Sequence, residues 1–259
     1  TDAAEVVPGS PEVHQYLGRL YLARGRSLIE PVSEGDDILH TTAGPTQLQR
    51  ALDYFHSGED HLRTADGLDG NNPETLYLLG LSLALQGKED EALETWLRLL
   101  DLDLAHQDCT LQVAGLLQAR AGRTGNMEDL RRSVDCYNRA AQLGPMPTPF
   151  PVGYAIALAS LGDYESSAAL LSQAKVDESA ISNNRQAKEL EEIRQVAARL
   201  RALKERAGVL EQENPGSLDL LRIRAQVSII EKRFLCASYW LEQILSRNRD
   251  DAQAWVLLG

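Results

Sequence analysis

The sequence predicts an all-α protein built as a solenoid of stacked helix pairs. Three observations support this prediction. Leu and Ala are abundant and only 5% of the residues are aromatic, a composition that favours helices. Two short patterns of small and large residues alternate along nearly the whole chain of 259 residues. Gly and Pro residues stand between these patterns, where helices end and begin.

The first pattern is a large residue followed three positions later by a Leu-Gly pair or a similar small pair. Its clearest copies lie at 76–80 and 255–259, and another lies at 14–21. The second pattern is a small residue, a large residue four positions later and an aliphatic or small residue three positions after that. Ala92, Trp96 and Leu99 form its best copy. Each pattern has the spacing of one helix face.

The two patterns recur with a fixed period. Gly80 and Ala92 are 12 residues apart, as are Ala155 and Ser167, and the return to the next first pattern takes 21 residues. That return is measured to the Leu of the next Leu-Gly pair, one residue before its Gly, and this one further residue makes the full period 34. Taking out 37 inserted residues leaves six repeats from residue 11 onward and the first eight residues of a seventh. A chance match to the two patterns would rarely account for every residue from 11 onward in this way.

This register resembles the tetratricopeptide repeat (TPR), whose pattern is W-x2-L-G-x2-Y, then A-x3-F, then P. The resemblance implies two antiparallel helices per repeat, stacked into a right-handed superhelix. Small residues such as Gly80 and Ala92 would lie where the two helices cross. Leu76, Leu83 and Trp96 would fill the space beside the crossing.

The repeat register divides the chain into eight segments. They are an N-terminal extension 1–10, a first repeat 11–72 that contains an inserted loop at 26–45, repeats 73–107, 108–147 and 148–183, an atypical fifth segment 184–217, a sixth repeat 218–251, and the start of a seventh at 252–259. The second helix of the first repeat is expected to be about two turns longer than usual. The end inside a repeat suggests a piece of a longer protein.

Gly25, Gly87, Gly122 and Gly162 are expected to end the first helices of their repeats. The proline-rich segment 144–151 predicts a stiff, extended connection, with Pro151 in the first turn of the following helix. A PxxP ligand is the functional alternative for this segment.

Segment 184–212 has no Gly or Pro between Arg185 and Ala207, and apolar residues recur at helical spacing along it. It is either an irregular repeat or a pair of helices fused into one rod, and the fused rod is favoured. Such a rod would divide the solenoid. A dimerising coiled coil is a further alternative, although the segment has fewer than four regular heptads.

Charge and cysteine content exclude several classes of protein. The 26 basic and 38 acidic residues give a net charge of −12, which argues against nucleic acid or an anionic lipid surface as the main partner. No apolar run is long enough to predict insertion into a membrane. Three widely spaced cysteines without CxxC spacing argue against a disulfide framework or a zinc site.

No catalytic motif is present: the sequence has no HExxH, GxGxxG, GxxxxGK[ST] or GxSxG. We therefore predict no enzyme activity, no cofactor and no metal site. The residues Glu34, Asp36, Asp37 and His40 in the insertion could hold a cation, and a small-molecule or metal enzyme built around them is the weakest of the alternatives. The turn 67–72 resembles a calcium loop only superficially, and a helix-ending turn before Pro73 explains it better.

The resemblance implies that the first helix of each repeat lines a concave groove. The partner-facing residues would be Gln15, Arg19, Tyr77, Leu81, Leu85, Gln112, Leu116, Arg120, Val152, Ile156, Arg222 and Gln226. Leu81 and Leu85 are as readily core residues. Some TPR proteins bind a C-terminal carboxylate through a clamp that begins with Lys; Gln15, Tyr77 and Gln112 stand at those positions here, so that ligand class is not expected.

The sequence thus predicts a non-enzymatic protein-interaction scaffold whose groove holds an apolar or amphipathic segment of a partner. The alternative is a TPR arm of a larger multidomain enzyme or of a secretion or assembly complex. Association with a second copy is left open. Unpaired cysteines favour the cytoplasm, and a periplasmic chain without its leader also fits.

Overall fold

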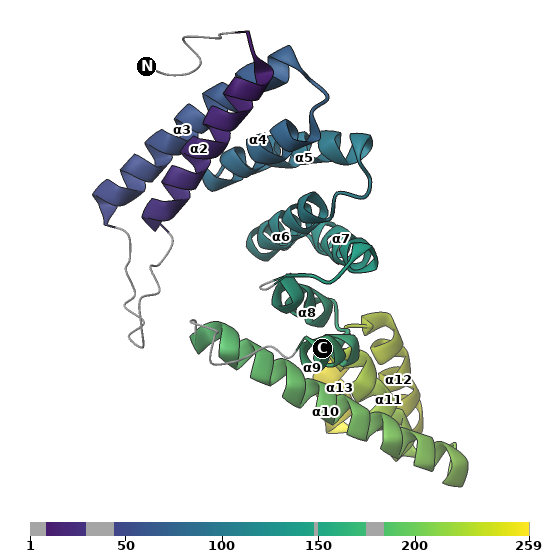
Figure 1. Cartoon of the computed structure of the whole chain (residues 1–259). Helices are drawn as coiled ribbons and strands as arrows, with labels where there is room; N and C mark the ends of the chain where they lie inside the picture. The colour runs from purple at the N-terminus through teal and green to yellow at the C-terminus, as the bar shows by residue number, and fades with distance from the viewer. Residues whose placement is uncertain (1–8, 30–43, 148–149, 175–183, 259) are drawn as a thin grey trace. The chain divides into compact units, whose positions relative to one another are not determined.

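A computed structural model of the chain describes residues 9–29, 44–147, 150–174 and 184–258, of which it describes 184–186 by their backbone alone. All regular structure in these residues is helical, as the composition and register predict (Figure 1). The chain forms two compact units, Thr1–Leu116 and Leu117–Gly259, which are described separately below. None of the described helices has both the length and the apolar character that crossing a bilayer requires.

The first unit is built from two helix pairs and the first half of a further helix. Its helices are α2 (Pro11–Ile29), α3 (Pro45–Leu68), α4 (Pro73–Leu85), α5 (Glu89–Leu102) and the beginning of α6 (Gln107–Thr124). Helix α2 packs on α3, α4 packs on α5, and α3 joins the two pairs by packing on α4 (Figure 1). Helix α3 has 24 residues and α5 has 14, so the second helix of the first pair is lengthened as predicted.

The core of the first unit has the small-against-large packing that the repeat register predicts. The Trp96 ring lies directly over Gly80, where a Cβ atom would come within 2.2 Å of the indole Nε1. That nitrogen donates a hydrogen bond to the Tyr77 carbonyl oxygen at 3.2 Å. Leu62 covers Gly18 in the same way, with its Cγ 2.4 Å from the position of a Cβ. These glycines are needed because the helices approach too closely for any side chain.

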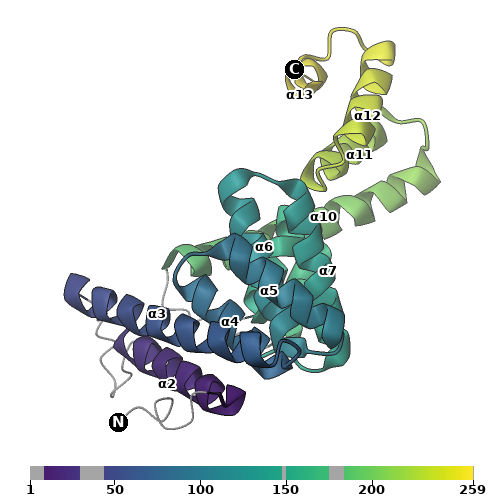
Figure 2. The same cartoon turned by 90° about the horizontal axis from the view of Figure 1, so that it is seen from above.

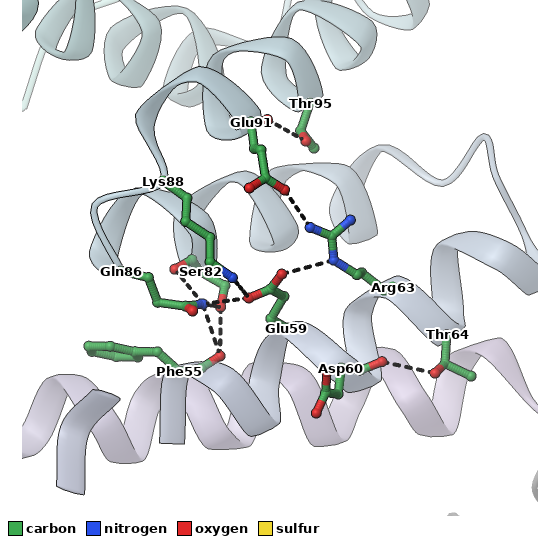
Figure 3. Close-up of polar contacts among 10 residues, drawn as sticks. All are labelled: Phe55, Glu59, Asp60, Arg63, Thr64, Ser82, Gln86, Lys88, Glu91 and Thr95. Atoms are coloured by element: carbon green, nitrogen blue, oxygen red, sulfur yellow. Dashed lines mark hydrogen bonds and ion pairs between the residues drawn. The ribbon is translucent and has the colours of Figure 1, made fainter. Parts of the chain in front are cut away.

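A buried carboxylate joins the two helix pairs of the first unit (Figure 3). Glu59 of α3 has a side chain only 8% exposed and accepts hydrogen bonds from Arg63 at 2.9 Å and from Lys88 at 2.7 Å. Gln86 at the end of α4 adds a third bond to the same carboxylate, at 2.9 Å. Burial raises the pKa of Glu59, but these three bonds together outweigh it, so that the pKa is lowered overall.

The second unit begins within α6 and contains α7 (Met127–Leu143), α8 (Phe150–Ser160), α9 (Tyr164–Gln173), α10 (Asn184–Glu213), α11 (Leu218–Ile230), α12 (Phe234–Arg247) and α13 (Ala252–Leu258). Helices α8 and α9 form one pair, and α11 and α12 form another, against which α13 packs.

Helix α10 is one continuous helix of 30 residues, which is the fused alternative for segment 184–212 (Figure 1). Figure 2 shows the C-terminal part of α10 leading to α11 and α12. Its apolar stripe is buried within the unit: Leu190, Ile193, Ala197 and Leu200 are each at most 4% exposed. Helix α10 packs on α8 and α9 and also on α11. The first half of the stripe is therefore covered by helices of the same chain, whereas Leu203, Ala207 and Leu210 in its second half are half-buried.

The two pairs of the second unit also meet directly at their turns. Gly162, in the turn between α8 and α9, has φ +94°, and a Cβ there would lie 2.5 Å from the carbonyl oxygen of Glu231, in the turn between α11 and α12. Lys204 of α10 bridges the same region with ion pairs to Glu165 at 2.6 Å and to Glu231 at 2.8 Å. The long helix and both pairs thus share one contact region.

Two of the four predicted helix-ending glycines are corrected. Gly87 and Gly162 do occupy left-handed turns. Gly25, however, lies inside α2, because the close approach of Phe55 makes it a packing residue instead. Gly122 lies inside α6, which continues to Thr124 before Gly125 takes the left-handed conformation with φ +71°.

The structure also bears on the predicted insertion at 26–45 and on the predicted start of the helix after the proline-rich segment. The insertion expected at 26–45 begins later, because residues 26–29 still belong to α2, and residues 30–43 lie outside the described part. The candidate cation ligands Glu34, Asp36, Asp37 and His40 therefore also lie outside it. Helix α8 begins at Phe150, which places Pro151 in its first turn as predicted.

Candidate functional site

The predicted partner-facing residues of the first unit fall into two groups. Tyr77 and Gln112 lie together: the Tyr77 ring stacks on His106 with 5.2 Å between the ring centroids, and its hydroxyl is hydrogen-bonded to Gln112. Burial is the main cause of the raised pKa of Tyr77. Gln15 instead donates a hydrogen bond to Asn72 at 3.3 Å, next to the start of α4.

The remaining predicted residues of this unit differ in exposure. Arg19 is exposed on α2, whereas Leu81, Leu85 and Leu116 are half-buried. The side chains of Leu81 and Leu85 are thus neither full core residues nor freely exposed. They leave a partly apolar surface on α4.

In the second unit, two of the predicted residues have structural roles that limit contact with a partner. Arg120 forms a two-bond ion pair with Asp129, at 2.7 and 2.8 Å, which links α6 to α7. The hydrogen bonds from Arg120 hold the pKa of Asp129 below its usual range. Val152 is 4% exposed and belongs to the apolar core formed with α9 and α10. Both lie on first helices, as the register predicts, but Val152 is covered by neighbouring helices and Arg120 is held by its ion pair to Asp129.

Arg222 and Gln226 are brought together in a small hollow between α11, α12 and α13. Arg222 is also held by acidic residues, with ion pairs to Asp219 at 3.1 Å and to the buried Asp251 at 2.7 Å. Its guanidinium charge is therefore compensated within the unit, which leaves Gln226 as the less constrained of the two.

Ile156 lies at the meeting point of two adjoining hollows in the second unit. The larger, of about 370 Å³, is bounded by the end of α6, the start of α7, α8, the start of α10 and the turn after α11. The smaller, of about 210 Å³, continues between α8, α9 and α10. Both are lined by Ile156, Ser160, Glu189 and Lys232. Together they form one groove, which we call the Ile156 groove.

The Ile156 groove has an apolar floor with charged residues beside it. Leu130 and Ala121 line the larger hollow, and Ile193 and Val196 line the smaller one. Gln118 is fixed at one side, because its amide donates to the Gly153 carbonyl oxygen at 2.8 Å and accepts from the Tyr137 hydroxyl at 3.0 Å. Among the described residues, no group of three or more His, Cys, Asp or Glu side chains is arranged to hold a metal ion.

Of the four residues that line both hollows, the sequence predicts Ile156 as partner-facing but not Ser160, Glu189 or Lys232. Glu189 belongs to α10, which the register could not place beside α8 because the fused helix departs from the repeat. Lys232 did carry a signal: it stands seven residues after Ala225, as Gly87 follows Gly80 and Gly162 follows Ala155. A lysine at the position of a turn glycine could have marked it.

No model of a known protein family matches the sequence, and no curated protein matches it. Solved structures do resemble it. A tetratricopeptide repeat protein from Parabacteroides merdae is 13% identical, with 99% of this chain and 87% of that chain covered at a TM-score of 0.49. YrrB, described as a TPR protein with an unusual peptide-binding site, is 13% identical over 98% and 94% of the two chains at 0.45. Pseudomonas aeruginosa pilF is 11% identical over 94% and 97% at 0.47.

At such identities no residue role is carried over from these proteins to this one. The description of the fold relies instead on the chain itself: its 34-residue register, its successive helix pairs, and the packing of Trp96 over Gly80. These features give the chain the fold of the tetratricopeptide repeat family.

Proposed function

We propose that the chain is a non-enzymatic protein-interaction scaffold and that the Ile156 groove binds an apolar or amphipathic segment of a partner protein. The observation that carries this proposal is the pair of adjoining hollows with an apolar floor, lined by the first helices α6 and α8 and by α10. A groove of this shape suits a helix or an extended segment that inserts one or two apolar side chains.

The charged side chains that line the groove, Lys232, Glu189 and Glu192, suit contacts with polar groups of a partner segment. Arg120, Asp129 and Lys204 do not line it and are held in ion pairs between helices, which stabilise packing. In the first unit, Tyr77 and Gln112 offer a second polar and aromatic contact area, which we include in the proposal as a separate contact for the same kind of partner.

The proposal can be tested by filling the groove without removing any existing contact. Gly122 lines the larger hollow from inside α6, and a Cβ added there would meet nothing within 4 Å. Gly122→Phe should therefore place a ring in the hollow and leave the fold intact. Gly67→Phe is the matched control, because Gly67 also lies in a helix, α3, with open space around it.

The assay is selection from a phage-displayed library of random dodecapeptides on the immobilised chain, followed by binding measurements with the selected peptides. We expect Gly122→Phe to weaken their binding by about tenfold or more, a loss of about 1.4 kcal/mol, and Gly67→Phe to leave it unchanged. Equal binding to wild type and Gly122→Phe, with both variants folded by circular dichroism, would contradict the proposal.

A further inference from the structure

The turn between α11 and α12 has a lysine where the other repeats have a glycine. Gly87 and Gly162 take the left-handed conformation at the equivalent positions, and Lys232 takes it too, with φ 55°. Lys232 is the one non-glycine residue with positive φ in the described part of the chain. That conformation is strained for a residue with a Cβ, and a glycine would avoid the strain. A strained residue of this kind points to a role for its side chain.

The side chain of Lys232 leads into the Ile156 groove. Its ammonium donates a hydrogen bond to the carbonyl oxygen of Ser160, the last residue of α8, at 2.6 Å. A cation is favoured at that helix end, which explains how the side chain is held. Its charge, however, is not neutralised by an acid: among the side chains that the structure describes, no carboxylate forms an ion pair with Lys232.

A charge of the opposite sign lines the same groove from a different element. Glu189 of α10 is exposed and borders both hollows, and no described side chain forms an ion pair with it. Its neighbour Glu192 is different, because Lys188 lies 3.9 Å from that carboxylate. The groove thus presents an apolar floor, one lysine and two glutamates. Of the two glutamates, Glu192 is paired with Lys188, whereas Glu189 forms no ion pair with Lys232 or with any other described side chain.

We propose that the partner segment carries an apolar side chain flanked by one acidic and one basic side chain, with the acid bound by Lys232 and the base bound by Glu189. This inference rests on the proposed function and specifies its partner. The apolar side chain would cover Ile156 and Leu130. Two opposite charges at fixed places also set the direction in which the segment lies, because the reversed segment would bring like charges together.

Dodecapeptide selection on single variants tests each charge separately. Peptides selected on the wild type should be enriched in an acidic and a basic residue, in one order, on either side of an apolar residue. Selection on Lys232→Met should lose the acidic preference and keep the basic one, and selection on Glu189→Gln should do the reverse. Individual wild-type peptides should bind each variant about fivefold more weakly, the upper range for a solvent-accessible ion pair.

Matched controls lie on the same long helix. Arg201→Met and Glu191→Gln remove exposed charges of α10 that do not line the groove, and selection on them should give the wild-type pattern. Lys232→Arg should keep the acidic preference. Lys232→Gly removes the same charge and also relieves the backbone strain, so its selection should match that of Lys232→Met even if the methionine variant is less stable.

The outcomes separate this inference from the proposed function. One outcome is that the selected peptides lose binding to Gly122→Phe and yet show no charge preference. That result would overturn the inference and leave groove binding in place. The same charge preference in wild type and in Lys232→Gly would overturn the role of Lys232. No peptides dependent on the hollow would overturn both proposals.

Discussion

The contact between the turns at Gly162 and Glu231 yields a sharp prediction for Gly162→Ala, because that contact holds the α11–α12 turn beside α8, where it borders the Ile156 groove. Any residue with a Cβ loses about 1–2 kcal/mol in the left-handed conformation that Gly162 adopts. In addition, the new Cβ would lie 2.5 Å from the Glu231 carbonyl oxygen and 2.6 Å from its carbon. These are backbone atoms, so the turn must move, and overpacking of this kind costs about 1–3 kcal/mol.

Gly87→Ala separates the two costs. Gly87 has a similar left-handed conformation, with φ +77°, but a Cβ there would meet nothing within 4 Å. We therefore expect Gly87→Ala to lower the free energy of unfolding by about 1–2 kcal/mol and Gly162→Ala to lower it by about 2–5 kcal/mol.

Urea denaturation followed by circular dichroism gives the two losses. A repeat chain can unfold in parts, so hydrogen exchange should accompany it. Amides of the turn 231–234 should exchange faster in Gly162→Ala and at the wild-type rate in Gly87→Ala. Equal losses of stability in the two variants, or an unchanged turn in Gly162→Ala, would refute the direct contact between the turns.

Two further predictions concern the first unit. Trp96→Ala should lower the free energy of unfolding by about 3–5 kcal/mol, because it empties the space over Gly80; a loss below about 1 kcal/mol in urea denaturation would argue against this packing. Glu59→Gln should cost about 1–3 kcal/mol at pH 7, because Lys88 and Arg63 lose a buried partner. Since the pKa of Glu59 is lowered in the folded chain, its contribution is present above the ordinary value of 4.5 and is lost as the pH falls through the lowered pKa. The gap in stability between wild type and Glu59→Gln should therefore narrow on acidification from pH 7 to pH 3, and a constant gap would contradict the assignment.

The repeat register predicts the fold well wherever packing follows one rule. Trp96, Gly80 and Ala92 could be placed from spacing alone, because a close helix crossing admits only small residues on one side and leaves space for a large one beside it. The same register wrongly predicts that Gly25 and Gly122 end helices, because each of these glycines lies inside a helix.

The candidate site was less predictable, because it depends on which helices cover which faces. Spacing placed Val152 and Ile156 four residues apart on the same helix, but only the structure shows that the core covers Val152 and the groove exposes Ile156. Glu189 comes from a helix that departs from the repeat. Lys232 could be recognised as unusual, yet its bond to Ser160 depends on the meeting of two turns that lie 72 residues apart.

Hydrogen exchange with and without a selected dodecapeptide tests the central claim most directly, because it locates the bound segment on the unmodified chain. The account predicts that added protection concentrates at 118–130, 156–160, 189–196 and 231–233, the segments that line the Ile156 groove. Gly122→Phe should abolish that protection. Protection confined to the outer residues of α12, such as Leu235 and Tyr239, with none around Ile156, would contradict it.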